Sequence, residues 1–111
     1  MKILLLGGTG QVGTELRRSL APLGEVVITT RDGQLPDGAP ALALDLAEIA
    51  RIAPLLARVH PDVVVNATAY TAVDRAETEP EAAFRINEQV PAELAAACAT
   101  ESATLVHLST D

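Results

Sequence analysis

The chain has 111 residues, the usual size of one domain and long enough to bury a hydrophobic core. Its net charge of −7 excludes nonspecific binding to DNA or RNA, which needs a basic surface, and argues against binding to an anionic membrane. A single cysteine, Cys98, excludes an intrachain disulfide and a cysteine-rich metal site. The first apolar run is too short for a signal peptide or a membrane span, so we expect a cytoplasmic protein.

The first part of the chain alternates apolar runs with one amphipathic segment. Hydrophobic residues make up 49% of the chain, but with one Phe and one Tyr the core must consist of Ala, Val, Leu and Ile. That composition suits parallel strands covered by helices. Hydrophobic periodicity and β-branched residues predict a strand at 2–7, a helix at 11–22 ending near Pro22 and Gly24, and a strand at 25–30.

The remaining elements continue the alternation. Turn-forming residues at 31–40 predict a loop, and ALALD at 41–45 predicts a third strand. A helix is expected at 47–59, with Pro54 either kinking it or lying in its first turn. After a fourth strand at 63–66, the Ala- and Glu-rich residues 71–99 predict a short helix and then a longer one, followed by a fifth strand at 103–109.

This alternation predicts an α/β fold, a doubly wound parallel sheet of the Rossmann type. Right-handed crossovers between parallel strands give the strand order 3-2-1-4-5. The chain ends directly after the fifth strand, so we expect residues 1–111 to be the N-terminal, dinucleotide-binding part of a longer protein, truncated after that strand.

The sequence GGTGQVG connects the first strand to the first helix. In this setting Gly7 permits the tight turn, Gly10 lets the backbone approach a pyrophosphate, and Gly13 lets the helix pack closely on the strand. The free amides near Gln11 and Val12 at the helix start would face the anion. The alternative is an ordinary glycine-rich turn.

The residues after the second strand bear on which nicotinamide cofactor is bound. An acid at the strand end would bind the ribose hydroxyls of NAD, but the strand ends in Thr30 and Arg31, with no acid before Asp32. Because an arginine can bind a phosphate in bidentate fashion, we predict that NADPH is preferred and NADH remains possible. The alternative is a solvated loop arginine.

Polar residues also follow the third, fourth and fifth strands. Asp45 is predicted either to accept a hydrogen bond from the adenine amino group or to cap the following helix, and both roles are compatible. Asn66 can hold together a turn of small residues that lets the cofactor ribose lie against the backbone, and the alternative is a simple small-residue turn. Ser109 and Thr110 end the fifth strand, where a hydroxyl can bind a substrate carbonyl oxygen or simply cap a turn.

His60, His107 and Cys98 do not form a metal-binding pattern. We expect His107, inside an apolar strand, to be a core or near-core residue, and Cys98 to pack within a helix.

Several segments together resemble the extended short-chain dehydrogenase/reductase family. They are GGTGQVG, Asp45-Leu46, PDVVVNATAYTAVDRAE, Ile86-Asn87 and HLSTD, and they span essentially the whole chain. The resemblance is to members that reduce the C4 ketone of the nucleotide sugar dTDP-4-dehydro-L-rhamnose with NADPH.

The resemblance implies a role for each matching residue. Gly10, Gln11 and Val12 would line the pyrophosphate, and Asp45 and Leu46 would flank the adenine. Thr110 would be the catalytic hydroxyl that orients the sugar carbonyl. The remaining matches would contact the cofactor ribose or shape the helix beside the active site: Ala67, Thr68, Ala69 and Asn87.

The chain departs from the family in one respect. The catalytic Tyr-x-x-x-Lys is not in it, because Asp74 lies four residues after Tyr70; we expect that pair and the nucleotide-sugar domain beyond residue 111. The resemblance further implies a homodimer, and Mg²⁺ in some relatives, although no ligands for Mg²⁺ are recognisable. Two alternatives remain: an epimerase or dehydratase with tightly bound NAD, and a non-catalytic, reductase-like regulatory subunit.

Overall fold

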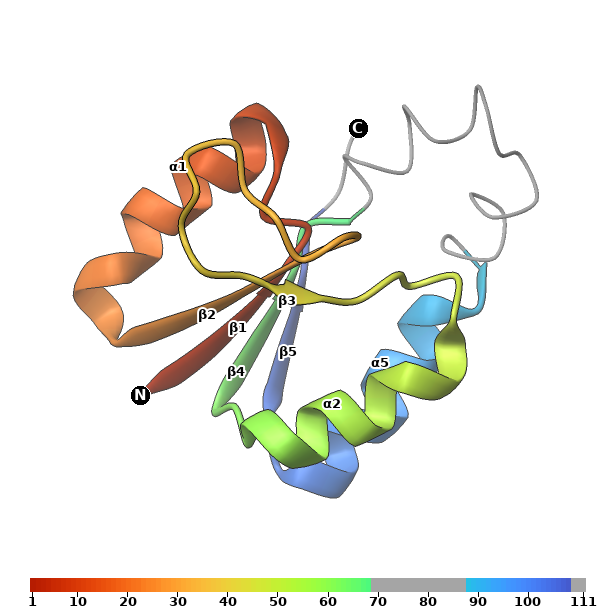
Figure 1. Cartoon of the computed structure of the whole chain (residues 1–111). Coiled ribbons are helices and arrows are strands. Elements are labelled where there is room, and N and C mark those ends of the chain that lie inside the picture. Colours follow the sequence, from red (N-terminus) through yellow and green to blue (C-terminus); the bar gives the residue numbers. More distant parts are fainter. Residues whose placement is uncertain (69–87, 109–111) are drawn as a thin grey trace.

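The computed structural model describes residues 1–68 and 88–108, which form one parallel sheet with helices on both faces (Figure 1). The sheet order is β3-β2-β1-β4-β5, which confirms the predicted 3-2-1-4-5 arrangement. The strands are β1 (Lys2–Leu6), β2 (Glu25–Thr30), β3 (Leu42–Ala43), β4 (Val63–Asn66) and β5 (Thr104–His107).

The described helices lie near the positions predicted from the sequence. They are α1 (Gly10–Leu20), the 3₁₀ turn η1 (Ala21–Leu23), the 3₁₀ turn η2 (Ile49–Arg51), α2 (Ile52–Val59) and α5 (Val90–Glu101). Pro54 lies in the first turn of α2, where the missing N–H has no intrahelical partner to lose. At the far end of α2, the amide of left-handed His60 donates to Leu56 O at 2.8 Å, and His60 Nδ1 lies 3.2 Å from Glu101 Oε1.

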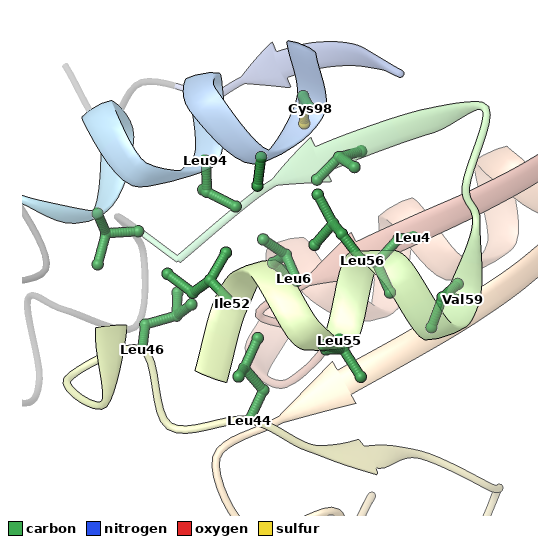
Figure 2. Packing of buried hydrophobic residues seen from close by; sticks show 13 residues of the cluster. Leu4, Leu6, Leu44, Leu46, Ile52, Leu55, Leu56, Val59, Leu94 and Cys98 are labelled. Carbon is green, nitrogen blue, oxygen red and sulfur yellow. The ribbon is translucent and has the colours of Figure 1, made fainter. Parts of the chain in front are cut away.

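The central strand β1 is buried on both faces because it lies between two hydrophobic clusters. Ile3 and Leu5 face the α1 side, together with Leu16 of that helix, while Leu4 and Leu6 face α2 and α5. Figure 2 shows the second cluster, in which Leu56 and Leu94 project from the two helices toward Leu4 and Leu6. This placement explains why the first strand is continuously apolar rather than alternating.

Three expected elements differ most from their predicted lengths. The third strand covers Leu42–Ala43 instead of 41–45, because it pairs with β2 only at Thr29↔Leu42 and Thr30↔Ala43. The predicted helix at 47–59 is divided into η2 and α2. The fifth strand ends at His107, and Ser109 lies outside the described residues, as does the short helix expected early in 71–99.

Candidate functional site

The turn after β1 requires glycine at its first position. Gly7 has φ +83°, and a Cβ placed on it would lie 3.1 Å from Ala67 C and from Thr68 N, the backbone that follows β4. The amide of Gly8 donates to Thr29 O at 3.1 Å, and the amide of Ala67 donates to Leu6 O at 2.9 Å. The turn is therefore fastened to the neighbouring strands on both sides.

Gly13 controls how closely α1 approaches this turn. A Cβ at Gly13 would lie 2.6 Å from Gly8 O and 2.8 Å from Gly7 O, and it would also collide with Gly8 C. The close approach of helix and strand that we predicted for Gly13 is therefore present.

The start of α1 is suited to an anion. The helix begins at Gly10, its N-cap Thr9 makes no side-chain capping hydrogen bond, and its first turn contains no acidic residue. Gln11 is exposed and Val12 is half-buried. Amides at a helix start lack intrahelical acceptors and carry the positive end of the helix dipole, so this geometry fits a phosphate group.

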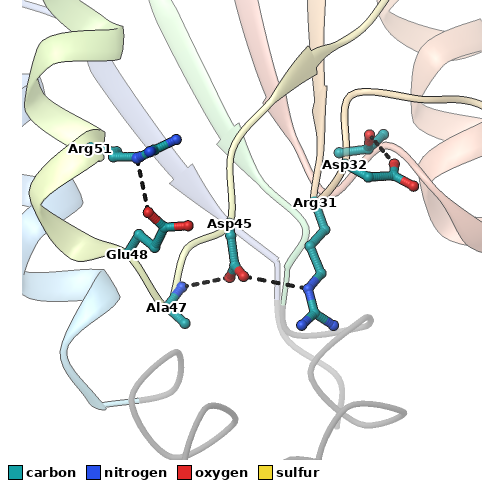
Figure 3. A network of polar contacts seen from close by, with 7 residues as sticks. Arg31, Asp32, Asp45, Ala47, Glu48 and Arg51 are labelled. Atoms are coloured by element: carbon teal, nitrogen blue, oxygen red, sulfur yellow. Dashed lines mark hydrogen bonds and ion pairs between the residues drawn. The ribbon is translucent and has the colours of Figure 1, made fainter.

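At the ends of β2 and β3, two residues predicted separately are paired. Arg31 Nε lies 3.4 Å from Asp45 Oδ2 (Figure 3), so Arg31 is not simply a solvated loop residue. The other oxygen, Asp45 Oδ1, accepts a hydrogen bond from the amide of Ala47 at 3.0 Å. Asp45 therefore stabilises a turn. The alternative that it caps the following helix is wrong, because the N-cap of η2 is Glu48.

Asp32, the first acid after β2, also stabilises its own loop. Its Oδ1 accepts hydrogen bonds from Thr30 Oγ1 at 3.3 Å and from the amide of Gln34 at 3.1 Å. One oxygen of the Asp32 carboxylate is thus already hydrogen-bonded within residues 30–34, where it stabilises the loop.

Asn66 holds the turn after β4, as predicted. Its Oδ1 accepts hydrogen bonds from both the amide and the hydroxyl of Thr68, and its Nδ2 lies 3.1 Å from His107 Nδ1. The prediction that His107 is a core or near-core residue is wrong, because its side chain is exposed.

Five of the predicted site residues follow the carboxyl ends of neighbouring strands. Gly7, Arg31, Asp45, Ala67 and Thr68 come from four such ends, and α1 starts beside them. Leu46 is buried in the core, with 5% of its surface exposed. Three predicted residues lie outside the described residues: Ala69, Asn87 and Thr110.

Sequence reasoning gave Gly8 too little weight. Its amide ties the turn to β2, and a Cβ there would collide with the side chain of Ile28. The signal was present, since Gly8 belongs to the glycine run, but its contact with Ile28 depends on how β1 and β2 pair. The Arg31–Asp45 contact was likewise not expected, because it joins two strands that the 31–40 loop separates.

The comparisons with known proteins agree with this geometry. The family model described as the RmlD substrate binding domain matches residues 1–111. The chain belongs to the RmlD substrate binding domain family.

Named relatives of this RmlD-family chain are reductases. It is 46% identical over 111 residues to a dTDP-4-dehydrorhamnose reductase of Burkholderia thailandensis, covering 100% of this chain and 34% of that protein. The chain thus spans about a third of the length of the curated relatives it matches.

Solved structures of dTDP-4-dehydrorhamnose reductases share this fold. A hypothetical dTDP-4-dehydrorhamnose reductase from Sulfolobus tokodaii superposes with a TM-score of 0.79 at 33% identity, over 98% of this chain and 39% of that one. The Bacillus anthracis dTDP-4-dehydrorhamnose reductase in complex with NADP has a TM-score of 0.70 at 25% identity, over 94% of this chain and 34% of that one.

In residues 1–68 and 88–108, no helix is long and apolar enough to cross a membrane. No group of three or more His, Cys, Asp or Glu side chains there is arranged to hold a metal ion.

Proposed function

We propose that the full-length protein is an NADPH-dependent reductase that converts dTDP-4-dehydro-L-rhamnose to dTDP-L-rhamnose. The observation that carries the proposal is the glycine turn, where Gly13 brings the start of α1 against the backbone of Gly7 and Gly8. This turn lies in a chain that is 46% identical throughout to a dTDP-4-dehydrorhamnose reductase.

Each part of the site has a proposed task. The amides from Gly10 to Val12 bind the pyrophosphate, and Arg31 binds the 2′-phosphate that distinguishes NADPH from NADH. Asp45, Leu46 and the Ala67–Ala69 segment surround the adenosine and ribose groups, and Asn87 shapes the helix beside the active site. NADPH supplies the hydride that is added to C4 of the sugar. We also propose that the full-length protein is a homodimer.

Thr110 is proposed to hold the sugar carbonyl oxygen through its hydroxyl while negative charge develops there. The proton on that oxygen would come from the tyrosine of a Tyr-x-x-x-Lys pair that we expect after residue 111. Thr110→Val should lower turnover by about 100-fold, since removal of one donor to a developing oxyanion typically has an effect of that order. Thr110→Ser, which keeps the hydroxyl, is the matched control.

The proposal is tested by calorimetry and product analysis on the full-length protein. We expect NADPH to bind more tightly than NADH, and dTDP-4-dehydro-L-rhamnose to be reduced at the expense of NADPH. If titration with millimolar NADPH and with millimolar NADH produces no heat of binding, the proposal is refuted. A stoichiometric NAD retained through purification would favour an epimerase or dehydratase instead.

A further inference from the structure

We propose that His107 is a positioning residue: through its hydrogen bond with Asn66 it holds the end of β5 against the turn after β4, and so sets the direction in which the chain continues toward Thr110. This inference rests on the proposed function and adds to it a residue that acts through Thr110. It starts from the contact between Asn66 Nδ2 and His107 Nδ1, which are 3.1 Å apart.

The two side chains meet because they lie opposite each other on one face of the sheet. Asn66 is in register with His107. Two residues earlier in each strand, Val64 and Leu105 are also in register, and both pack on the α2 and α5 side of the sheet. Because side chains alternate along a strand, Asn66 and His107 project to that same face, at the carboxyl end of the sheet. The contact therefore follows from the pairing of β4 with β5.

The other hydrogen bonds of Asn66 decide which group is the donor in this contact. Asn66 Oδ1 accepts the backbone amide of Thr68 at 3.1 Å, and it also accepts the Thr68 hydroxyl. A backbone amide can only donate, so the atom that it meets must be the oxygen of Asn66, and the side-chain nitrogen must face His107. His107 Nδ1 is then the acceptor, and the proton of the neutral imidazole lies on Nε2.

Asn66 holds the end of β5 at two points. Its backbone O accepts the amide of Leu108 at 3.0 Å, and its side chain donates to His107. Asn66 is only 7% exposed, so it is the fixed partner of the two. One attachment restrains the position of a chain, whereas two also restrain its direction. Thr110 follows Leu108 by two residues, so the direction of the chain at the end of β5 bears on where its hydroxyl lies.

The Asn66 side chain thereby connects two parts of the proposed site. Its oxygen holds Thr68, in the segment proposed to contact the cofactor, and its nitrogen holds His107, on the strand that leads to Thr110. Hydride transfer needs the sugar carbonyl at a fixed place relative to the nicotinamide, and a misplacement of about 1 Å can lower a rate by about 100-fold. Loss of the contact should therefore affect turnover more than binding.

Two substitutions of His107 separate the hydrogen bond from the imidazole ring. His107→Leu keeps a branched side chain but removes the acceptor. His107→Asn has an oxygen at the same distance along the side chain as Nδ1, so it can accept from Asn66 without an imidazole. Thr104→Leu is the matched control, because it puts the same leucine side chain at another exposed position of β5, opposite Val63 instead of Asn66.

The measurements are kcat and KM of the full-length protein with dTDP-4-dehydro-L-rhamnose, and the dissociation constant of NADPH by calorimetry. We expect His107→Leu to lower kcat by about tenfold, with KM and the NADPH constant within about twofold of wild type. His107→Asn should restore most of kcat, and Thr104→Leu should behave as wild type. In a Thr110→Val background, His107→Leu should lower kcat by less than about twofold, because the group that it positions is already lost.

The direction of the hydrogen bond is measured separately in the wild type. Long-range proton–nitrogen correlation spectra in mildly alkaline solution distinguish the two neutral tautomers of histidine, and we expect His107 to carry its proton on Nε2. A proton on Nδ1 would contradict the contact on which the inference stands.

Other outcomes overturn the inference in recognisable ways. Wild-type kcat in His107→Leu would refute it, and equal losses in His107→Leu and His107→Asn would show that the imidazole itself takes part in the reaction. A loss of NADPH affinity equal to the loss of kcat would place the effect on the cofactor instead. An undiminished loss in the Thr110→Val background would show that His107 does not act through Thr110. Should His107→Leu not fold, His107→Ala takes its place in the same comparison. If the wild type does not reduce the sugar, the proposed function itself fails.

Discussion

Gly13→Ala tests whether close contact between α1 and the glycine turn is needed. The added Cβ would lie 2.6 Å from Gly8 O and closer still to Gly8 C, whereas ordinary contacts begin near 3.4 Å, so helix and turn must separate by at least 0.8 Å, the difference for Gly8 O. The atoms that it meets at Gly7 and Gly8 belong to the backbone and cannot rotate away.

The expected cost follows from two opposing effects. Overpacking in a tight site destabilises a protein by about 1–3 kcal/mol, and we place this contact near the upper end because it involves several backbone atoms. Replacing glycine by alanine inside a helix restores up to about 1 kcal/mol. The net loss in the free energy of unfolding should therefore be about 2 kcal/mol.

Urea denaturation of the full-length protein measures this loss. With a denaturant slope of about 2 kcal/mol/M, the midpoint should fall by about 1 M. NADPH should also bind about tenfold more weakly, since the displaced turn misdirects an amide hydrogen bond to a charged phosphate.

Gly38→Ala is the control for an unspecific loss of stability. Gly38 has φ +78°, so alanine is strained there, but a Cβ would meet nothing within 4 Å. This variant should lose stability without losing affinity for NADPH. A Gly13→Ala protein with a wild-type midpoint and wild-type affinity would refute the reasoning.

Three further predictions concern the core and two titrating groups. Leu56→Ala removes a fully buried side chain and should cost about 2–5 kcal/mol in urea unfolding, whereas the same change at Leu23, which is 56% exposed, should cost under about 0.5 kcal/mol. Burial raises the pKa of the Cys98 thiol, so a disulfide reagent should modify it only as fast as the protein opens; rapid labelling of the native protein would contradict this. The hydrogen bond that the amide of Ala39 donates to Asp37 contributes most to holding the pKa of this carboxyl below its ordinary value of 3.8. A carboxyl with a lowered pKa adds stability above pH 3.8 that is lost as the pH falls through the folded-state pKa. An NMR titration of Asp37 with a midpoint at or above 3.8 would disprove this.

The sequence by itself determined the order of the elements, the glycine turn and the strand arrangement. These features depend on local patterns: apolar runs of strand length, the 3.6-residue period of Val12, Leu16 and Leu20, and the fixed handedness of crossovers between parallel strands. Gly7 was predictable for the same reason, since a tight turn between a strand and a helix needs a residue that tolerates positive φ.

Only the tertiary structure decided which side chains meet across the sheet. The Arg31–Asp45 ion pair, the Asn66–His107 contact and the shortness of β3 all depend on which strands are neighbours and in what register they pair. His107 lies in an apolar strand and was expected to be a core or near-core residue, but in the tertiary structure its side chain is exposed. Periodicity along a chain reports which face of an element is apolar; it carries no information about what a neighbouring element, far away in sequence, places opposite that face.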